Sequence, residues 1–280
     1  LCIHNICIPI KYIIQYIFFN FSLFYPKLLS FFIELSSYIA LMNYLQKSKN
    51  IDFPVFLWLL SLTILIFIII LIGGLTRLTD SGLSMVNWRP IMGIIPPLTN
   101  LDWINAFKEY KISPEFIIVN NSMELDDFKF IYWWEWFHRF FARIIGIVLI
   151  VPMLFFLIKK RISKKLLISL LILLLFGIFQ AVIGWWMVKS GLNENPYVSP
   201  YRLAFHLSNA IIILSILFWL TLNIWNNLSL NFLPKNYLEI ITFILFFFLI
   251  TTIISGAFMA GTNAGQSFNT FPLMNGKIIP

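Results

Sequence analysis

Charged residues are scarce in this chain of 280 residues: only 11% are Asp, Glu, Lys or Arg, whereas 60% are hydrophobic. Soluble globular proteins carry about 25% charged residues, so the composition excludes that class. Apolar runs of roughly 20 residues recur along the chain, which is the length that a helix needs to cross a bilayer. The composition therefore predicts an all-α, polytopic helical membrane protein.

Cysteine is nearly absent, since the two cysteines, Cys2 and Cys7, lie at the extreme N-terminus. This argues against a disulfide framework or a cysteine-ligated metal site. No arginine precedes Arg77, whereas mitochondrial presequences are rich in arginine. The net charge of +8 does not indicate a nucleic-acid partner, because five of the cations share one short loop and indicate membrane topology instead: Lys159, Lys160, Arg161, Lys164 and Lys165.

Five apolar segments predict five membrane spans, at about 54–75, 132–158, 166–188, 201–225 and 238–260. Segment 78–131 is predicted to be a long polar loop with seven acidic and four basic residues, so we expect it outside and the five-cation loop in the cytoplasm. Residues 1–41 are either an additional membrane or interfacial helix or an upstream extension, with the start of the protein at Met42. We expect residues 42–230 to form a four-helix-bundle unit and 231–280 to begin a second one.

A repeat supports this division, because the end of the first span recurs at the end of the fifth, 182 residues later. The offset aligns four pairs of identical residues: Gly74 with Gly256, Asn87 with Asn269, Pro90 with Pro272 and Met92 with Met274. We infer that a four-helix unit was duplicated. We then expect the sequence to be truncated at its C-terminus, with the remaining helices of the second unit beyond Pro280.

Ionisable residues in the second span indicate a functional site. Glu135 and His138 are three residues apart, so they share one helical face near the outer end of that span. Such groups are costly in a bilayer and call for a cofactor, an ion or a proton path. The only other histidine in an apolar helix, His206, is predicted to lie at equal depth. Two histidines suffice as ligands for a six-coordinate haem, whereas a zinc site requires more ligands. The alternative role for His138 and His206 is packing or hydrogen bonding between helices.

Several neighbouring residues leave two interpretations open. Glu135 either forms a structural ion pair with Arg139, four residues later, or handles protons beside a cofactor. Four arginines near the outer membrane face either reach the head groups or bind haem propionates: Arg77, Arg139, Arg143 and Arg202. Gly73, Gly74 and Gly184 are predicted to be close-packing points between helices.

Six strings in this sequence resemble the haem A synthase family: residues 73–84, 88–97, 135–139, 184–192, 199–206 and 269–276. The resemblance covers about residues 54–280. It implies eight helices in two similar four-helix halves, each with a histidine pair for a haem. His138 and His206 match the N-terminal pair, in the half associated with the substrate haem, and Glu135 matches the acidic residue implicated in catalysis. The second pair, which holds haem b, would lie beyond Pro280.

The implied reaction oxidises the C8 methyl of haem O to a formyl group, through a hydroxymethyl intermediate, and gives haem A. The implied partners are a haem O synthase, which supplies the substrate, cytochrome oxidase assembly factors and an electron donor that the sequence does not identify. Segment 78–131 lacks cysteine, as in the alphaproteobacterial and mitochondrial branch of the family, so we expect a bacterial inner membrane, with the mitochondrial inner membrane as the alternative. The rival functions are a bis-histidine b-type cytochrome that only transfers electrons and a transporter.

Overall fold

The computed structural model describes residues 2–3, 6–7, 52–87, 92–193, 196–228, 230, 236–267, 270 and 272–278. The chain divides into two units, Leu1–Phe53 and Pro54–Pro280. In the first unit, β1 (Cys2–Ile3) and β2 (Ile6–Cys7) form a two-residue antiparallel pair in which Cys2 lies opposite Cys7. Apart from these four residues, the predictions for residues 1–41 and for a boundary at Met42 lie outside the described residues.

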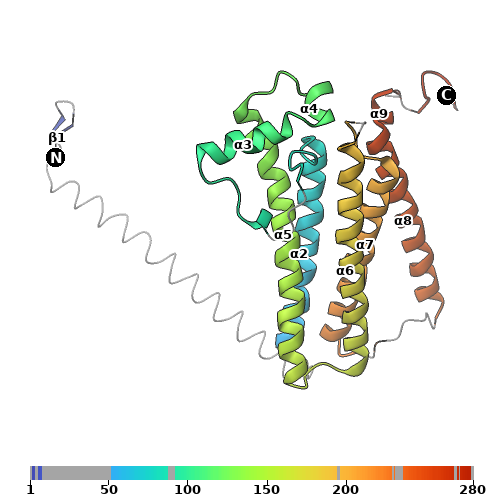
Figure 1. Ribbon diagram of the computed structural model, residues 1–280. Coiled ribbons are helices and arrows are strands. Elements are labelled where there is room, and N and C mark those ends of the chain that lie inside the picture. The colour runs from blue at the N-terminus through green and yellow to red at the C-terminus, as the bar shows by residue number, and fades with distance from the viewer. Residues whose placement is uncertain are drawn as a thin grey trace. The chain divides into compact units, whose positions relative to one another are not determined.

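Among the described residues, five helices are long and apolar enough to cross a membrane (Figure 1). They are α2 (Phe53–Leu78), α5 (Leu125–Ile158), α6 (Lys164–Gly191), α7 (Pro200–Trp225) and α8 (Tyr237–Thr262). The predicted polytopic, all-helical membrane architecture is confirmed. The predicted spans differ from these helices by at most three residues at each end, except that α5 begins seven residues earlier than expected.

Polar side chains set the ends of the long helices. Ser163 Oγ accepts a hydrogen bond from the amide of Leu166 at 3.2 Å and so begins α6. At α8 the side chain of Asn236 accepts from the amide of Glu239 at 2.9 Å. The helix ends at Thr262 and is capped by Asn263, which adopts the left-handed conformation with φ of 53°. The helix ends are therefore encoded locally, by the residues that flank each apolar run.

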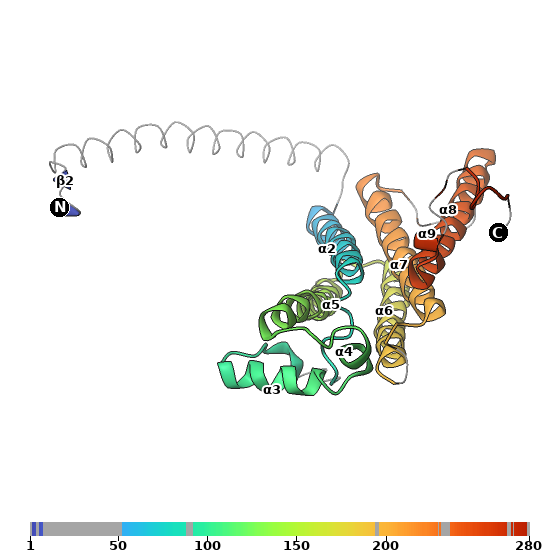
Figure 2. The same cartoon turned by 90° about the horizontal axis from the view of Figure 1, so that it is seen from above.

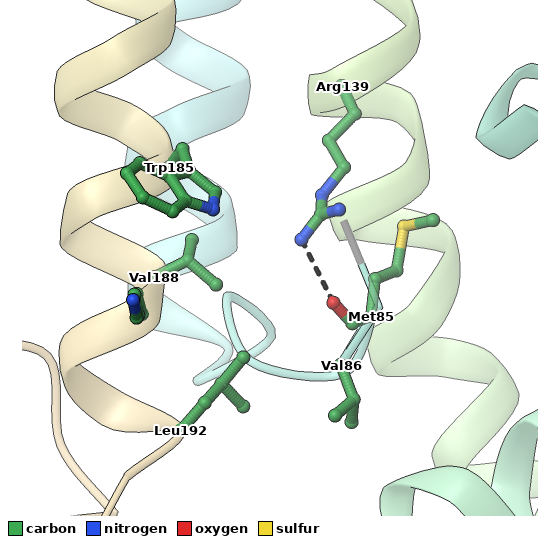
Figure 3. Close-up of a pocket in the computed structure, with 7 residues that line it drawn as sticks. Met85, Val86, Arg139, Trp185, Val188 and Leu192 are labelled. Carbon is green, nitrogen blue, oxygen red and sulfur yellow. Dashed lines mark hydrogen bonds between the residues drawn. The ribbon is translucent and has the colours of Figure 1, made fainter. Parts of the chain in front are cut away.

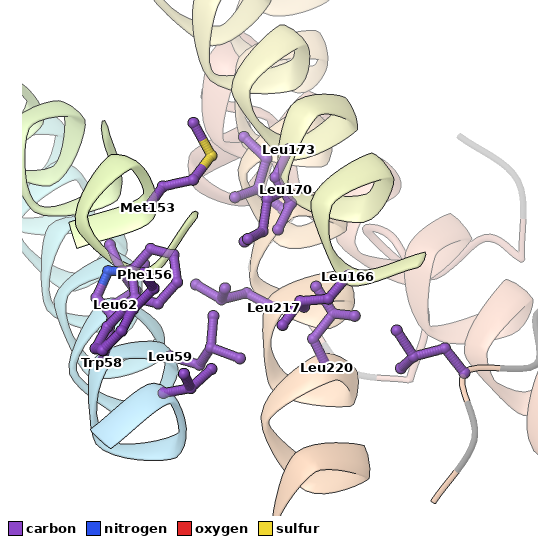
Figure 4. Close-up of a cluster of buried hydrophobic side chains, with 13 residues drawn as sticks. Trp58, Leu59, Leu62, Met153, Phe156, Leu166, Leu170, Leu173, Leu217 and Leu220 are labelled. Carbon is purple, nitrogen blue, oxygen red and sulfur yellow. The ribbon is translucent and has the colours of Figure 1, made fainter. Parts of the chain in front are cut away.

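Helices α2, α5, α6 and α7 share one apolar core at the end of the bundle that carries the 159–165 loop (Figure 4). Its buried members are Val55, Trp58, Leu59, Leu62, Met153, Phe156, Leu166, Leu170, Leu173, Ile213, Leu217, Leu220 and Leu230. Two threonine hydroxyls, of Thr63 on α2 and Thr221 on α7, are 3.1 Å apart within this layer. Helix α8 packs along α7, and at Gly261 its backbone lies against Pro200.

The segment expected to be a polar loop, 78–131, is largely folded, which corrects the prediction. It contains the short 3-10 helix η1 (Met92–Ile94), α3 (Asn100–Tyr110), α4 (Pro114–Ile118) and the first turns of α5. We call α3, α4 and these turns the cap. Thr99 and Asp102 begin α3 with a capping box, in which the Asp102 amide donates to Thr99 Oγ1 at 3.2 Å.

The cap has a core of its own. On α3, Trp103, Phe107 and Tyr110 recur at helical spacing and are all buried. They pack against Phe128 and other buried residues at the start of α5, namely Ile131, Tyr132 and Trp136. In Figure 2, which looks down on the cap, α3 lies beside the end of α5. This packing explains why α5 begins before the predicted span.

Candidate functional site

The structure brings the two predicted histidines together. His138 on α5 and His206 on α7 have ring centroids 6.5 Å apart, with their planes inclined by 60°. In the described part of the chain, the Nδ1 atoms of both rings are buried and have no hydrogen-bond partner. Two imidazoles from different helices therefore face a common space, and each has a nitrogen that the protein leaves unsatisfied.

A glycine on the neighbouring helix makes room for each imidazole. A Cβ atom built on Gly73 of α2 would lie 3.0 Å from His138 Cε1, and one built on Gly184 of α6 would lie 2.9 Å from His206 Cε1. Any larger residue would push the ring away. At Gly74, by contrast, a Cβ would meet nothing within 4 Å. The prediction of close packing thus holds at Gly73 and Gly184, where the contact is a histidine ring, and is wrong at Gly74.

This arrangement fits a haem iron between the two rings. Metal–nitrogen bonds are about 2 Å long and an imidazole centroid lies about 1.2 Å behind its nitrogen, so two axial imidazoles have centroids roughly 6.4 Å apart. The observed separation is 6.5 Å. Among the described residues, the histidine site included, no group of three or more His, Cys, Asp and Glu side chains could hold a metal ion.

Glu135 is buried one turn before His138 and accepts hydrogen bonds at both carboxylate oxygens. Ser84 Oγ and the amide of Met85 donate to Oε2, at 2.7 and 2.8 Å, and Arg139 Nη2 donates to Oε1 at 2.5 Å. The ion pair that the sequence left open is therefore present. Arg139 also donates to the carbonyl of Met85 at 3.1 Å, so the pair fastens the loop after α2 onto α5.

Two of the other arginines named from the sequence have protein partners. Arg77 donates to Asp80 at 2.6 Å and to the carbonyl of Ala260 at 2.9 Å, which links α2 to the end of α8. Arg202 donates to the carbonyl of Trp186 at 2.6 Å and stacks on that indole, 4.3 Å from its centroid. These contacts hold helix ends together, whereas Arg139 lines a cavity.

That cavity, of about 240 Å³, lies between the loop after α2 and the helices α5 and α6 (Figure 3). Its lining comes from the loop after α2 and from α5 and α6: Met85, Val86, Arg139, Trp185, Val188, Lys189 and Leu192. Arg139 directly follows His138, and Trp185 directly follows Gly184. An apolar wall with two cationic side chains suits an amphipathic molecule that carries negative charge.

Sequence reasoning missed two residues beside His206. The side-chain amide of Gln180 on α6 donates to the backbone carbonyl of His206 at 3.1 Å, and its Nε2 lies 3.4 Å from the ring Nε2. Asn209 on α7 donates to Gln180 Oε1 at 2.6 Å. Polar side chains within apolar helices are a signal that could have identified both.

Comparisons with known proteins agree with this architecture. The family model described as "Cytochrome oxidase assembly protein" (COX15-CtaA) matches residues 56–280. The chain is 44% identical over 230 residues to "Heme A synthase" of Nitrosospira multiformis, covering 81% of this chain and 64% of that protein. It is 42% identical over 238 residues to "Heme A synthase" of Parvibaculum lavamentivorans, and this match covers 85% of this chain and 69% of that protein. It is 46% identical over 227 residues to "Heme A synthase" of Maricaulis maris, and this match covers 80% of this chain and 65% of that protein.

The chain thus spans 64% of the length of the Nitrosospira relative. No solved structure matches it. The family model extends from the start of α2 past the end of α8 and includes the histidine pair, Glu135 and both glycine contacts. This chain is a multi-pass membrane protein that belongs to the COX15-CtaA family of cytochrome oxidase assembly proteins.

Proposed function

We propose that this chain carries the substrate half of a haem A synthase, an oxidoreductase that converts the C8 methyl of haem O to a formyl group. The observation that carries the proposal is the pair of buried imidazoles, 6.5 Å apart, each with an unsatisfied Nδ1. The relatives called "Heme A synthase" support the same assignment. The unit formed by α2, α5, α6 and α7 is then the haem-binding half.

In this proposal His138 and His206 hold the iron of the substrate haem, which supplies the redox-active centre when it is bound. Arg139 and Lys189 line the adjoining cavity and are placed to receive propionate groups. The apolar side chains of that cavity exclude water from the edge of the macrocycle. Gly73 and Gly184 leave the space in which the two imidazole rings are seated.

We assign to Glu135 the handling of a proton beside the substrate. Among the described residues, Ser84 and Met85 both donate to its Oε2 atom, whereas Oε1 accepts from Arg139. Oε1 is therefore the atom at which a proton would be held or released. A positioned general acid or base typically contributes about 10²- to 10⁴-fold to a rate.

The cellular setting follows from the same proposal. Haem O would come from a haem O synthase in the same bilayer, and haem A would pass to the factors that assemble cytochrome oxidase. We place the chain in a bacterial inner membrane, with the mitochondrial inner membrane as the alternative. The acidic segment 78–131, which contains the cap, would face outward and the basic loop at 159–165 would face the cytoplasm.

Pigment analysis tests the proposal. The chain is expressed in a host that makes haem O, purified, and its extracted haems are separated and weighed by mass spectrometry. We expect the unmodified chain to bind haem O, and bound haem to be lost in His138→Ala and His206→Ala. Haem A or its hydroxymethyl precursor should form when the predicted haem b half is also supplied. Glu135→Gln should keep its haem but lower the product at least tenfold.

Two outcomes would replace this function by another. Haem O that is bound but returned unchanged when the haem b half is supplied, with no effect of Glu135→Gln, would favour a cytochrome that only transfers electrons. A chain without any haem absorption would reject both functions and favour the transporter.

A further inference from the structure

Helix α3 of the cap has a second apolar face, besides the one that is buried against α5. Leu101 and Ile104 are three residues apart and share this face, and they are 65% and 53% exposed. In the chain that leads into the helix, Ile95 and Leu98 are 68% and 75% exposed. We call these four residues the exposed stripe. Large aliphatic side chains that gather on a surface mark a contact with another apolar body, which is either a protein or a lipid surface.

The charged residues of α3 are arranged as in helices that lie on a membrane. Lys108 is exposed and continues the stripe, since it is four residues after Ile104. The acidic residues Asp102 and Glu109 are seven residues apart, so they share a different side of the helix. A helix at a membrane surface buries its apolar side among the acyl chains, while a lysine at the border reaches the phosphate groups.

Ring contacts between α3 and α5 give the depth of each end of α3. Near its C-terminal end, Phe107 and Tyr110 have ring centroids 5.0 and 5.2 Å from that of Phe128. Near its N-terminal end, Trp103 lies 5.2 Å from Tyr132. Tyr132 follows Phe128 by four residues, which is about 6 Å along a helix. The end of α3 that carries the exposed stripe therefore lies about 6 Å nearer to the interior of the membrane than its other end.

That level on α5 is the outer boundary of the bilayer. The apolar run of the second span begins at about residue 132, and Tyr132, Trp133 and Trp134 are of the types that gather at the head-group level. Figures 1 and 2 both show α3 lying across the direction of α5 rather than along it. A helix that crosses a span at this level lies roughly in the plane of the membrane surface.

We propose that the exposed stripe is a membrane anchor, in which Ile95, Leu98, Leu101 and Ile104 enter the outer lipid–water interface beside α5. The partner is the phospholipid surface itself. This contact holds the cap down on the bilayer from the side, in addition to its packing on α5. The inference requires that α5 crosses the membrane, and it does not depend on the proposed haem chemistry.

Helix α4 shows that depth, and not apolar character alone, carries this inference. It also exposes apolar side chains, such as Ile117 and Ile118 at 59% and 60%. However, α4 packs against the C-terminal end of α3, where Phe116 lies 5.7 Å from Tyr110. We therefore expect these isoleucines to lie above the lipid, and they provide a control that matches the stripe in exposure and in side-chain type.

Spin labels test the position of the stripe. Cys2 and Cys7 are replaced by serine, and single cysteines are introduced as Leu101→Cys, Ile104→Cys, Ile117→Cys and Glu109→Cys. Each variant is labelled with a nitroxide in phosphatidylcholine nanodiscs. Oxygen concentrates among acyl chains, whereas a nickel chelate stays in water. We expect the labels at 101 and 104 to be relaxed by oxygen and shielded from nickel, and the labels at 109 and 117 to be reached by nickel.

Hydrogen exchange of α3 in the same nanodiscs measures the strength of the anchor. Leu101→Gln combined with Ile104→Gln changes two side chains that the fold leaves mostly exposed, so the packing of α3 on α5 should persist. Removing two aliphatic groups from the lipid should speed the exchange of α3 roughly tenfold or more. Ile117→Gln combined with Ile118→Gln is the matched control and should leave the exchange of α3 unchanged.

Three outcomes would overturn the anchor. Nickel access at 101 and 104 equal to that at 109 would show that the stripe faces water. Shielding of 101 and 104 from both oxygen and nickel would show that a protein covers it. Equal exchange of α3 in the unmodified chain and in the Leu101→Gln, Ile104→Gln variant would show that the stripe does not hold the cap. Neither measurement requires bound haem, so failure of the proposed function leaves this test intact.

Discussion

Alanine at position 184 tests how closely the site is fitted to an imidazole. The added Cβ would lie 2.9 Å from Cε1 and 3.4 Å from Nδ1 of His206. Non-bonded carbons are at their optimal separation at about 3.5–4.0 Å, so the ring would have to retreat by roughly 0.6 Å or more. It cannot do so freely, because Gln180 bonds the carbonyl of the same residue.

The magnitude follows from the cost of overpacking. Forcing one extra methyl-sized group into a packed site costs about 1–3 kcal/mol. If the unmodified ring position is the one that binds iron, this cost appears in haem affinity, as a loss of roughly 5- to 150-fold. The measurement is a titration of Gly184→Ala with iron protoporphyrin IX in lipid nanodiscs.

Gly177→Ala is the matched control, since position 177 lies on the same helix, where a Cβ would meet nothing within 4 Å. Replacing glycine by alanine within a helix is otherwise stabilising by roughly 0.5–1 kcal/mol, so the control should bind haem normally and unfold no more easily. The same contrast is expected between Gly73→Ala and Gly74→Ala on α2. If Gly184→Ala and Gly177→Ala bind haem within twofold of each other, the argument from the glycine contacts is refuted.

Two further predictions concern the stability of the fold. Thr63→Val removes a hydroxyl that lies 3.1 Å from that of Thr221. The substitution should lower the free energy of unfolding in a bilayer by about 0.6 kcal/mol, and at most by about 1.7 kcal/mol. A steric-trapping measurement that finds no change in this free energy would contradict the prediction. Burial raises the pKa of Glu115 in the cap from 4.5 to about 8, although a hydrogen bond from Tyr110 at 2.9 Å opposes the shift. Between these two pH values the folded cap holds a proton that the unfolded chain has released, so the stability of the cap should fall as pH rises through this window. Hydrogen exchange of α3 and α4 should show that fall, and Glu115→Gln should abolish it; a pH dependence that persists in the variant would assign it to another group.

The sequence predicted what depends on hydrophobicity and helical periodicity. The five spans follow from long apolar runs, and equal depth in the second and fourth spans anticipated that His138 and His206 would meet. The catalytic and ligand roles of these residues stay predictions. The cap was missed because its charged residues outweigh a short apolar face, which becomes visible only when Trp103, Phe107 and Tyr110 are placed on one helix.

Other features depend on tertiary contacts that periodicity does not encode. Ser84 and Met85 reach Glu135 only because the loop after α2 turns back over α5. Gln180 and Asn209 were visible in the sequence as polar residues in apolar helices, but their bond to each other and the bond from Gln180 to the His206 carbonyl depend on how α6 and α7 are rotated against each other. The sequence could therefore indicate which residues are unusual, though not which of them meet.

The continuity of α5 has a mechanical consequence. Its 34 residues extend about 51 Å, well beyond the roughly 30 Å of a bilayer interior. No glycine or proline interrupts it between Leu125 and Gly146, and Pro152 lies farther still from the cap. The segment that carries Glu135 and His138 is therefore continuous with the first turns of α5, which belong to the cap. A tilt of the cap would be transmitted along this helix to both residues.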